Sequence, residues 1–273
     1  CAYLCGGPVS DHEVRVAAEL IEKLRLGMHV NIKSSSISET VQEFLKGVKD
    51  VPIRDFVSLC TDDVHAADLL TTGHINHIVN ECIKGGIEPM DAIRFGTINA
   101  ARELHLDDAG AIAPGYVADM QIVKDLNFDT RPDYVFVAGK TVAHNGLIIS
   151  LWRKPQEYPN TVKIPQIKSP DDFAIYPEGN MALVFSASRA SMVPNQPLVY
   201  KEFPQEDGKL VIPEEEQDEF QFLAIVNRHG KGTMTKVVCS NFHLMHGCIA
   251  STISHDSHNM TIAYRDPKDA YIS

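Results

Sequence analysis

The chain has 273 residues and a formal charge of −11, with 44% hydrophobic and 22% charged residues. This balance is ordinary for a globular protein with a small-molecule substrate, and it argues against a nucleic-acid partner, which would need a basic face. No apolar stretch reaches the ~20 residues of a membrane span, so we expect no membrane partner. The six cysteines include no CxxC pair, which favours reduced thiols and a cytoplasmic location.

The first part of the chain alternates short apolar strands with amphipathic helices. Helices are predicted at 13–27, 36–48 and 75–86, with one or two more within 88–106, and strands at 28–33 and 54–60. Gly27 is the expected C-cap of the first helix. Strands that alternate with helices pair in parallel, which indicates an α/β fold. Only about three such units fit, so a barrel or doubly wound sheet would be incomplete.

The pattern changes after Leu106. Short strands broken by Gly and Pro turns are predicted at 110–123 and 132–146, and a proline-rich linker follows. A mixed α+β domain comes next, and its acidic stretch 204–220 is expected to be a solvated loop. The predicted parts are an α/β unit at 1–108, a small β segment at 109–150, a linker at 151–171 and the last domain at 172–273.

Polar clusters follow three apolar stretches in the first part. They are "SDHE" (10–13), "KSSSIS" (33–38) and "CTDD" (60–63), the last followed by His65, His74 and His77. Each cluster lies where a predicted parallel strand ends, which is where α/β folds build their sites. Imidazoles and carboxylates are ligands for Zn²⁺, Fe²⁺ or Mn²⁺, and a carboxylate can also carry a proton.

Simpler interpretations remain open for these clusters. Ser and Asp are common helix N-caps, and a single histidine such as His12 is often a capping or core residue. A fourth polar cluster, His255-Asp256-Ser257-His258-Asn259, interrupts a predicted strand at 251–264. Asp, Ser and Asn favour tight turns, so this segment could be an ordinary polar turn or a binding tip.

Several motifs together carry a family resemblance. They are "SDHE", "CTDD", "LLTTGHINHIV", "DAIRFGTINAAREL", "GAIAPGYVADMQIV" and "ISHDSHN". In this order they resemble the adenine deaminases of the amidohydrolase superfamily, whose barrels depend on metals. The H-x-E and P-C-x-x-C signature of the small zinc deaminases is absent.

The resemblance implies the C-terminal part of a (β/α)8 barrel, a small β-sandwich segment and a separate α+β C-terminal domain. It also implies one or two divalent metals (Mn²⁺, Fe²⁺ or Zn²⁺) and a hydroxide, activated by metal, that converts adenine to hypoxanthine and ammonia. This activity would serve purine salvage.

The resemblance also implies roles for single residues. His12 corresponds to a metal ligand at the end of barrel strand six, and Asp62 to a metal ligand and proton carrier at the end of strand eight. Glu13 would bind substrate or metal, and Asp63 is expected to cap the next helix, although a swap with Asp62 stays open. His255, Asp256, His258 and Asn259 are expected to contact the substrate, since they offer hydrogen bonds to a purine edge.

The family's first-strand H-x-H pair, fourth-strand acid and fifth-strand histidine do not appear. We therefore expect a C-terminal fragment, inactive by itself, with exposed strand edges that favour a homo-oligomer. The alternatives are another cyclic amidohydrolase, such as a dihydroorotase relative, and a non-catalytic binding or structural module.

Overall fold

The computed structural model describes residues 2–36, 41–49, 51, 54–128, 131–150, 156–186, 199–255 and 257–273, without the side chains at 43 and 49. The chain divides into two compact units, Cys1–Pro155 and Gln156–Ser273. The boundary falls inside the segment 151–171 that the sequence predicts as a linker. Each unit is described separately below.

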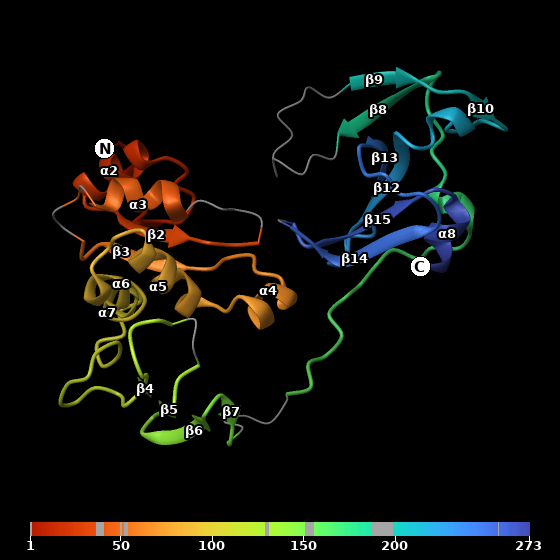
Figure 1. Ribbon diagram of the computed structural model, residues 1–273. Helices are drawn as coiled ribbons and strands as arrows, with labels where there is room; N and C mark the ends of the chain where they lie inside the picture. The colour runs from red at the N-terminus through yellow and green to blue at the C-terminus, as the bar shows by residue number, and fades with distance from the viewer. Residues whose placement is uncertain are drawn as a thin grey trace. The chain divides into compact units, whose positions relative to one another are not determined.

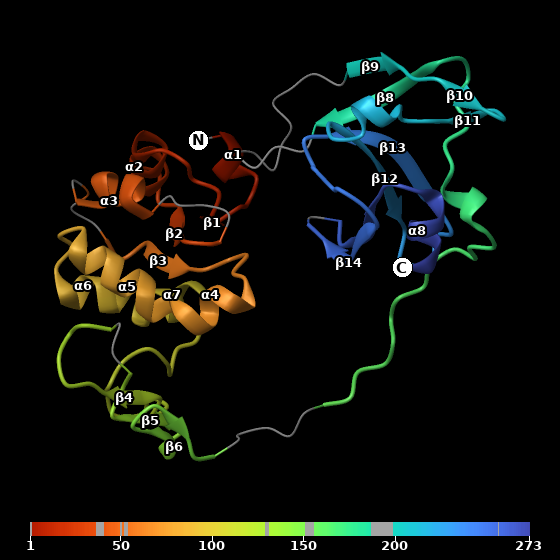
Figure 2. The same ribbon diagram turned by 45° about the vertical axis from the view of Figure 1, so that its right-hand side comes forward.

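The first unit contains a parallel sheet. Its strands are β1 (Ser10–Asp11), β2 (His29–Lys33) and β3 (Val57–Cys60), in the order β1-β2-β3. Ser10 pairs with His29, and Val30 pairs with Val57. The parallel α/β arrangement predicted from the alternation of strands and helices is present (β2 and β3 in Figure 1, β1 in Figure 2). Because β1 pairs with β2 and β2 with β3 in parallel, all three strands end on the same edge.

The described helices of this unit are α1 (Ala2–Cys5), α2 (Ala17–Arg25), α3 (Val41–Lys49), α4 (Ala66–Thr71), α5 (Ile75–Lys84), α6 (Pro89–Phe95) and α7 (Ile98–Glu103). The helix predicted at 13–27 begins at Ala17, four residues later than predicted, because Glu13 and its neighbours form the loop that connects β1 to α2. Residues 37–40, at the start of the helix predicted at 36–48, lie outside the described residues.

The predicted capping role of Asp63 is wrong. Helix α4 begins at Ala66, and its N-cap residue is His65, whose side chain makes no capping hydrogen bond. Asp63 lies two residues before the cap, where its carbonyl accepts a hydrogen bond from the Ser36 amide at 2.9 Å. The loop after β3 is therefore longer than the motif suggested, and it contacts the loop after β2.

Alternation along β2 and β3 separates an apolar face from a polar face. Val30, Ile32, Val57 and Leu59 belong to the main core cluster of the unit, together with apolar residues of α2, α3 and α5. The intervening side chains of the same strands are polar: His29, Asn31, Lys33 and Ser58, with Cys60 at the end. Helices pack on the first face because only that face offers apolar surface to bury.

A small antiparallel sheet follows in the first unit. Its strands are β4 (Met120–Ile122), β5 (Tyr134–Val137), β6 (Lys140–His144) and β7 (Leu147–Ile148), paired in chain order. The predicted strand at 110–123 is only three residues long. Ala138 and Gly139 form the turn between β5 and β6, both at positive φ, which matches a two-residue hairpin.

The second unit is a mixed α+β structure, as predicted from the sequence. Six of its described strands form a sheet in the order β14-β15-β12-β13-β8-β9, with helix α8 beside it (Figures 1 and 2). The strands are β8 (Met181–Ser186), β9 (Val199–Glu202), β12 (Phe220–Val226), β13 (Met234–Ser240), β14 (Cys248–Ser254) and β15 (Asn259–Tyr264), and the helix is α8 (Pro267–Ile272).

The acidic stretch 204–220 is more ordered than predicted. It forms a hairpin of β10 (Gln205–Glu206) and β11 (Lys209–Leu210), and then the 3₁₀ turn η2 (Glu214–Glu216). Leu210 and Ile212 are buried in the core of the second unit. The prediction of a solvated loop failed because these apolar residues, spaced two apart, supply one buried face among the acids.

In the described residues, no helix is long and apolar enough to cross a membrane.

A candidate metal centre at the ends of the parallel strands

Three of the predicted site residues meet at the carboxyl edge of the parallel sheet. His12 and Glu13 follow β1, and Asp62 follows β3 at a positive φ of 56°. One ligand atom from each of these residues lies within 4.8 Å of the others. The distance from His12 Nε2 to Glu13 Oε1 is 3.4 Å. We call His12, Glu13 and Asp62 the strand-end cluster.

Lys33, the last residue of β2, joins this cluster from the strand between. Its ammonium Nζ lies 2.8 Å from Glu13 Oε1 and 2.9 Å from Asp62 Oδ2. Its side chain is only 12% exposed, whereas those of Glu13 and Asp62 are 59% and 29% exposed. Burial acts to lower the pKa of Lys33, but the hydrogen bonds to both carboxylates outweigh it, and the pKa lies above its ordinary value.

The neighbouring acid Asp11 has a different role. Its carboxylate accepts a hydrogen bond from the Glu13 amide at 2.7 Å and forms an ion pair with Lys23 of α2. Burial acts to raise the pKa of Asp11, but hydrogen bonds from Lys23 and from the Glu13 amide outweigh it and lower the pKa. Asp11 thus fixes the turn that presents Glu13.

The donor set of the strand-end cluster fits a divalent cation. One imidazole nitrogen and two carboxylate oxygens are a ligand combination that Zn²⁺, Fe²⁺ and Mn²⁺ accept. The three side chains come from two loops, and their partial exposure leaves room for water or substrate ligands. The site can therefore hold a cation and also offer a carboxylate for proton transfer.

A buried polar network lies on the same face of the sheet, closer to the strand starts. Glu103 at the end of α7 accepts a hydrogen bond from Asn31 Nδ2 at 2.8 Å and one from Ser58 Oγ at 3.0 Å. His29 Nε2 lies 3.3 Å from the same carboxylate. Burial lowers the pKa of His29, and the charge of Glu103 opposes this only in part.

A cavity of about 260 Å³ opens at the ends of β2 and β3. Its lining includes the hydroxyls of Ser34, Ser35, Ser36 and Thr61 and the imidazoles of His74 and His77. Thr61 Oγ1 lies 3.0 Å from His74 Nε2. Two of the three histidines that follow the "CTDD" motif thus line a polar cavity to which no member of the strand-end cluster contributes. The remaining one, His65, is the N-cap residue of α4.

The hairpin predicted at 251–264 is present in the second unit as β14 and β15. His255 and His258 are at its tip with ring centroids 6.0 Å apart, and His258 has a positive φ of 52°. Asn259 Oδ1 accepts a hydrogen bond from Asn227 Nδ2 at 3.3 Å, which gives this residue a structural partner. Asp256 lies outside the described residues. Contact of this tip with a substrate stays a prediction.

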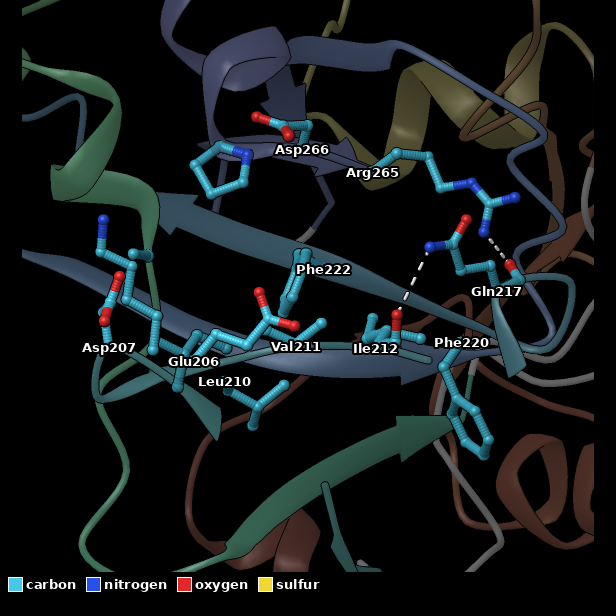
Figure 3. A pocket seen from close by; sticks show the side chains of 14 residues that line it. Glu206, Asp207, Leu210, Val211, Ile212, Gln217, Phe220, Phe222, Arg265 and Asp266 are labelled. Atoms are coloured by element: carbon cyan, nitrogen blue, oxygen red, sulfur yellow. Dashed lines mark hydrogen bonds between the residues drawn. The ribbon is translucent and has the colours of Figure 1, made fainter. Parts of the chain in front are cut away.

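The second unit also has a cavity of about 420 Å³, with Leu210, Ile212 and Phe222 in its lining (Figure 3). Arg265 lies on one side and hydrogen-bonds to the backbone carbonyls of Gln217 and Met245. Through these bonds the Arg265 guanidinium is held by the backbone of the second unit.

Sequence reasoning did not assign roles to Lys33, Asn31, Ser58 or Glu103. The alternation in "HVNIK" carries a usable signal, since it places His29, Asn31 and Lys33 on one face of a strand. Nothing in the local pattern identifies Glu103 as their partner, because it comes from α7, 72 positions after Asn31.

One protein-family model matches within each of the two units. The amidohydrolase family model matches residues 5–142, just over half of the 273 residues, and the chain belongs to this family. In the second unit, residues 198–273 match the model of the adenine deaminase C-terminal domain.

Curated relatives match nearly the whole chain. An adenine deaminase from Kosmotoga olearia is 33% identical over 100% of this chain and 47% of its own length. One from Desulforamulus reducens is 34% identical over 98% of this chain and 46% of its own length. The chain thus spans about half the length of these relatives. A solved β-aspartyl dipeptidase from Fervidobacterium islandicum is 17% identical with a TM-score of 0.42, covering 53% of this chain and 42% of that chain.

Proposed function

We propose that this protein takes part in the hydrolytic deamination of adenine to hypoxanthine and ammonia, with His12, Glu13 and Asp62 in the metal-dependent active site. The observation that carries the proposal is the convergence of these side chains, within 4.8 Å, at the carboxyl edge of the parallel sheet. The relatives named adenine deaminase and the match of the last domain favour adenine over the substrates of other cyclic amidohydrolases.

His12, Asp62 and Glu13 would hold the cation. A bound divalent cation supplies Lewis acidity and lowers the pKa of water near the substrate. The Asp62 carboxylate accepts a proton from the water that attacks C6 of adenine and returns one to the departing amino group. In the absence of the cation, Lys33 keeps this carboxylate in place through its 2.9 Å contact with Oδ2.

The purine is proposed to bind in the cavity lined by residues 34–36, 61, 74 and 77. Its lining includes Thr61, the neighbour of Asp62 in the chain, and its hydroxyls and imidazoles can pair with ring nitrogens. A site built from such groups discriminates against analogues that lack the matching hydrogen bonds. The native metal is proposed as Mn²⁺, Fe²⁺ or Zn²⁺.

The test compares two neighbouring substitutions of the same kind. Adenine turnover, followed by release of ammonia, is measured for this chain and, if the gene encodes a longer protein, for that protein. Asp62→Asn keeps the shape of the side chain but removes the proton carrier, so turnover should fall by roughly 10²–10⁴-fold. Asp63→Asn is the matched control and should change turnover by no more than a few fold. Near-normal turnover of Asp62→Asn would contradict the assignment of Asp62.

A further inference from the structure

Lys33 brings a full positive charge into the strand-end cluster. Its Nζ contacts Glu13 and Asp62 at 2.8 and 2.9 Å, and these residues are two of the three candidate ligands. The ammonium therefore bonds to oxygens that a divalent cation would also use. A cation coordinated by both carboxylates would lie within a few ångströms of Nζ if the lysine did not move.

We propose that the Lys33 ammonium and a divalent cation are alternative occupants of the strand-end cluster, so that Lys33 is a positioning residue that sets the cation affinity of the site. Without the cation, Lys33 holds Glu13 and Asp62 together against their mutual repulsion. When the cation binds, the ammonium leaves the two carboxylates. The inference rests on the proposed function only in taking the cluster as a cation site, and it does not depend on the substrate.

Electrostatics decides the direction of the effect. Coulomb repulsion between a single and a double positive charge at ~4 Å remains substantial even in a watery environment, and the low exposure of Lys33, 12%, makes its screening incomplete. Loss of the ammonium also removes the contacts that hold the two carboxylates in place. However, the divalent cation then no longer competes with the ammonium for these carboxylates. Removal of the charge should therefore strengthen cation binding.

The same unit offers a matched control. Lys23 of α2 also bridges two carboxylates, those of Asp11 and Glu19, and its side chain is 22% exposed. Substitution of Lys23 by an uncharged residue removes the same charge, but neither of the two partners of Lys23 belongs to the strand-end cluster. A comparison of the two lysines separates competition at the cluster from a general change in net charge.

The experiment measures binding of Zn²⁺ and Mn²⁺ to the chain by calorimetry, without any substrate. Lys33→Met should lower the Kd by roughly tenfold or more at low ionic strength, with a smaller difference at high salt. Lys33→Arg, which keeps the charge, and Lys23→Met should each stay within about threefold of the wild type. An unchanged or weaker affinity of Lys33→Met, or no binding by either protein, would overturn the proposal.

A second measurement uses the unmodified protein and does not depend on the folding of a variant. The ammonium resonances of Lys33 and Lys23 are followed by NMR as Zn²⁺ is added. The Lys33 ammonium should lose its ion-pair signature at saturation while that of Lys23 keeps it. Retention of both ion pairs by Lys33 in the Zn²⁺-saturated protein overturns the proposal. A failure of adenine turnover alone would instead count against the proposed function.

Discussion

Asp62 and Asp63 carry the same side chain at neighbouring positions, but the fold gives them different surroundings. Asp62 has a positive φ and lies in the strand-end cluster with His12 and Glu13. The backbone of Asp63 pairs with Ser36 in the loop after β2. Sequence motifs identify such a pair but cannot separate its members, because the backbone conformation at Asp62 decides which of the two side chains lies in the strand-end cluster.

His29 gives a prediction for pH dependence. Burial lowers the pKa of His29 below its ordinary value near 6.5, so the unfolded chain takes up a proton in a range where the folded chain does not. The free energy of unfolding should therefore fall as the pH decreases from above 6.5 toward the folded pKa, by at most about 1.4 kcal/mol per pH unit from this group.

The measurement compares urea unfolding of the wild type and His29→Gln between pH 7.5 and 5.5. The wild type should lose more stability over this range, because the variant lacks the titrating group. Parallel curves for the two proteins would show that His29 does not carry the effect. All other residues are the same in the two proteins, so their contributions cancel in the difference.

Helices and strands of the first unit are the part that the sequence predicts best. The alternation in "HVNIK" and the helical spacing in 75–86 are strong periodic signals, and β2 and α5 appear within one or two residues of the predicted bounds. The predictions were less accurate where turns decide the structure. Residues 111–119, for example, were predicted as part of a strand but hold none. The prediction of a solvated loop at 204–220 failed for a related reason, since it rested on the acidic composition and did not take account of the buried Leu210 and Ile212.

Gly47 fixes the contact between helices α2 and α3. A Cβ atom at this position would meet Leu20 Cδ2 at 2.9 Å and the Ala17 carbonyl oxygen at 3.1 Å. Gly47→Val should therefore force the two helices apart and lower the free energy of unfolding by about 1–3 kcal/mol, the usual cost of overpacking.

The matched control is Glu22→Val in the partner helix α2, where the side chain is exposed. It should cost only about 0.5 kcal/mol, which is the difference in helix propensity. Both values come from urea unfolding monitored by circular dichroism. Equal losses for the two variants would mean that propensity, and not the α2–α3 contact, controls this position.

At the scale of the whole molecule, the two units have separate cores. The core of the first is built from residues between Val14 and Phe128, and that of the second from residues between Phe173 and Ala270. The sequence indicates this division through its change of pattern and the proline-rich segment. It cannot give the placement of Glu103 under β2 and β3, because long-range packing between α7 and the sheet determines that contact.

Separate cores predict separate folding. The segment before β8 belongs to the second unit, since the Tyr264 hydroxyl donates a hydrogen bond to the Phe173 carbonyl at 2.7 Å and Lys236 Nζ donates one to the Asp172 carbonyl at 2.9 Å. A polypeptide of residues 156–273 should therefore fold alone and unfold cooperatively in urea. Residues 179–273 lack the buried Phe173 ring and both backbone acceptors, so this shorter polypeptide should lose about 3–5 kcal/mol or fail to fold. Circular dichroism and the binding of a hydrophobic dye distinguish the outcomes. A non-cooperative, dye-binding 156–273 polypeptide would show that the second core depends on the first unit.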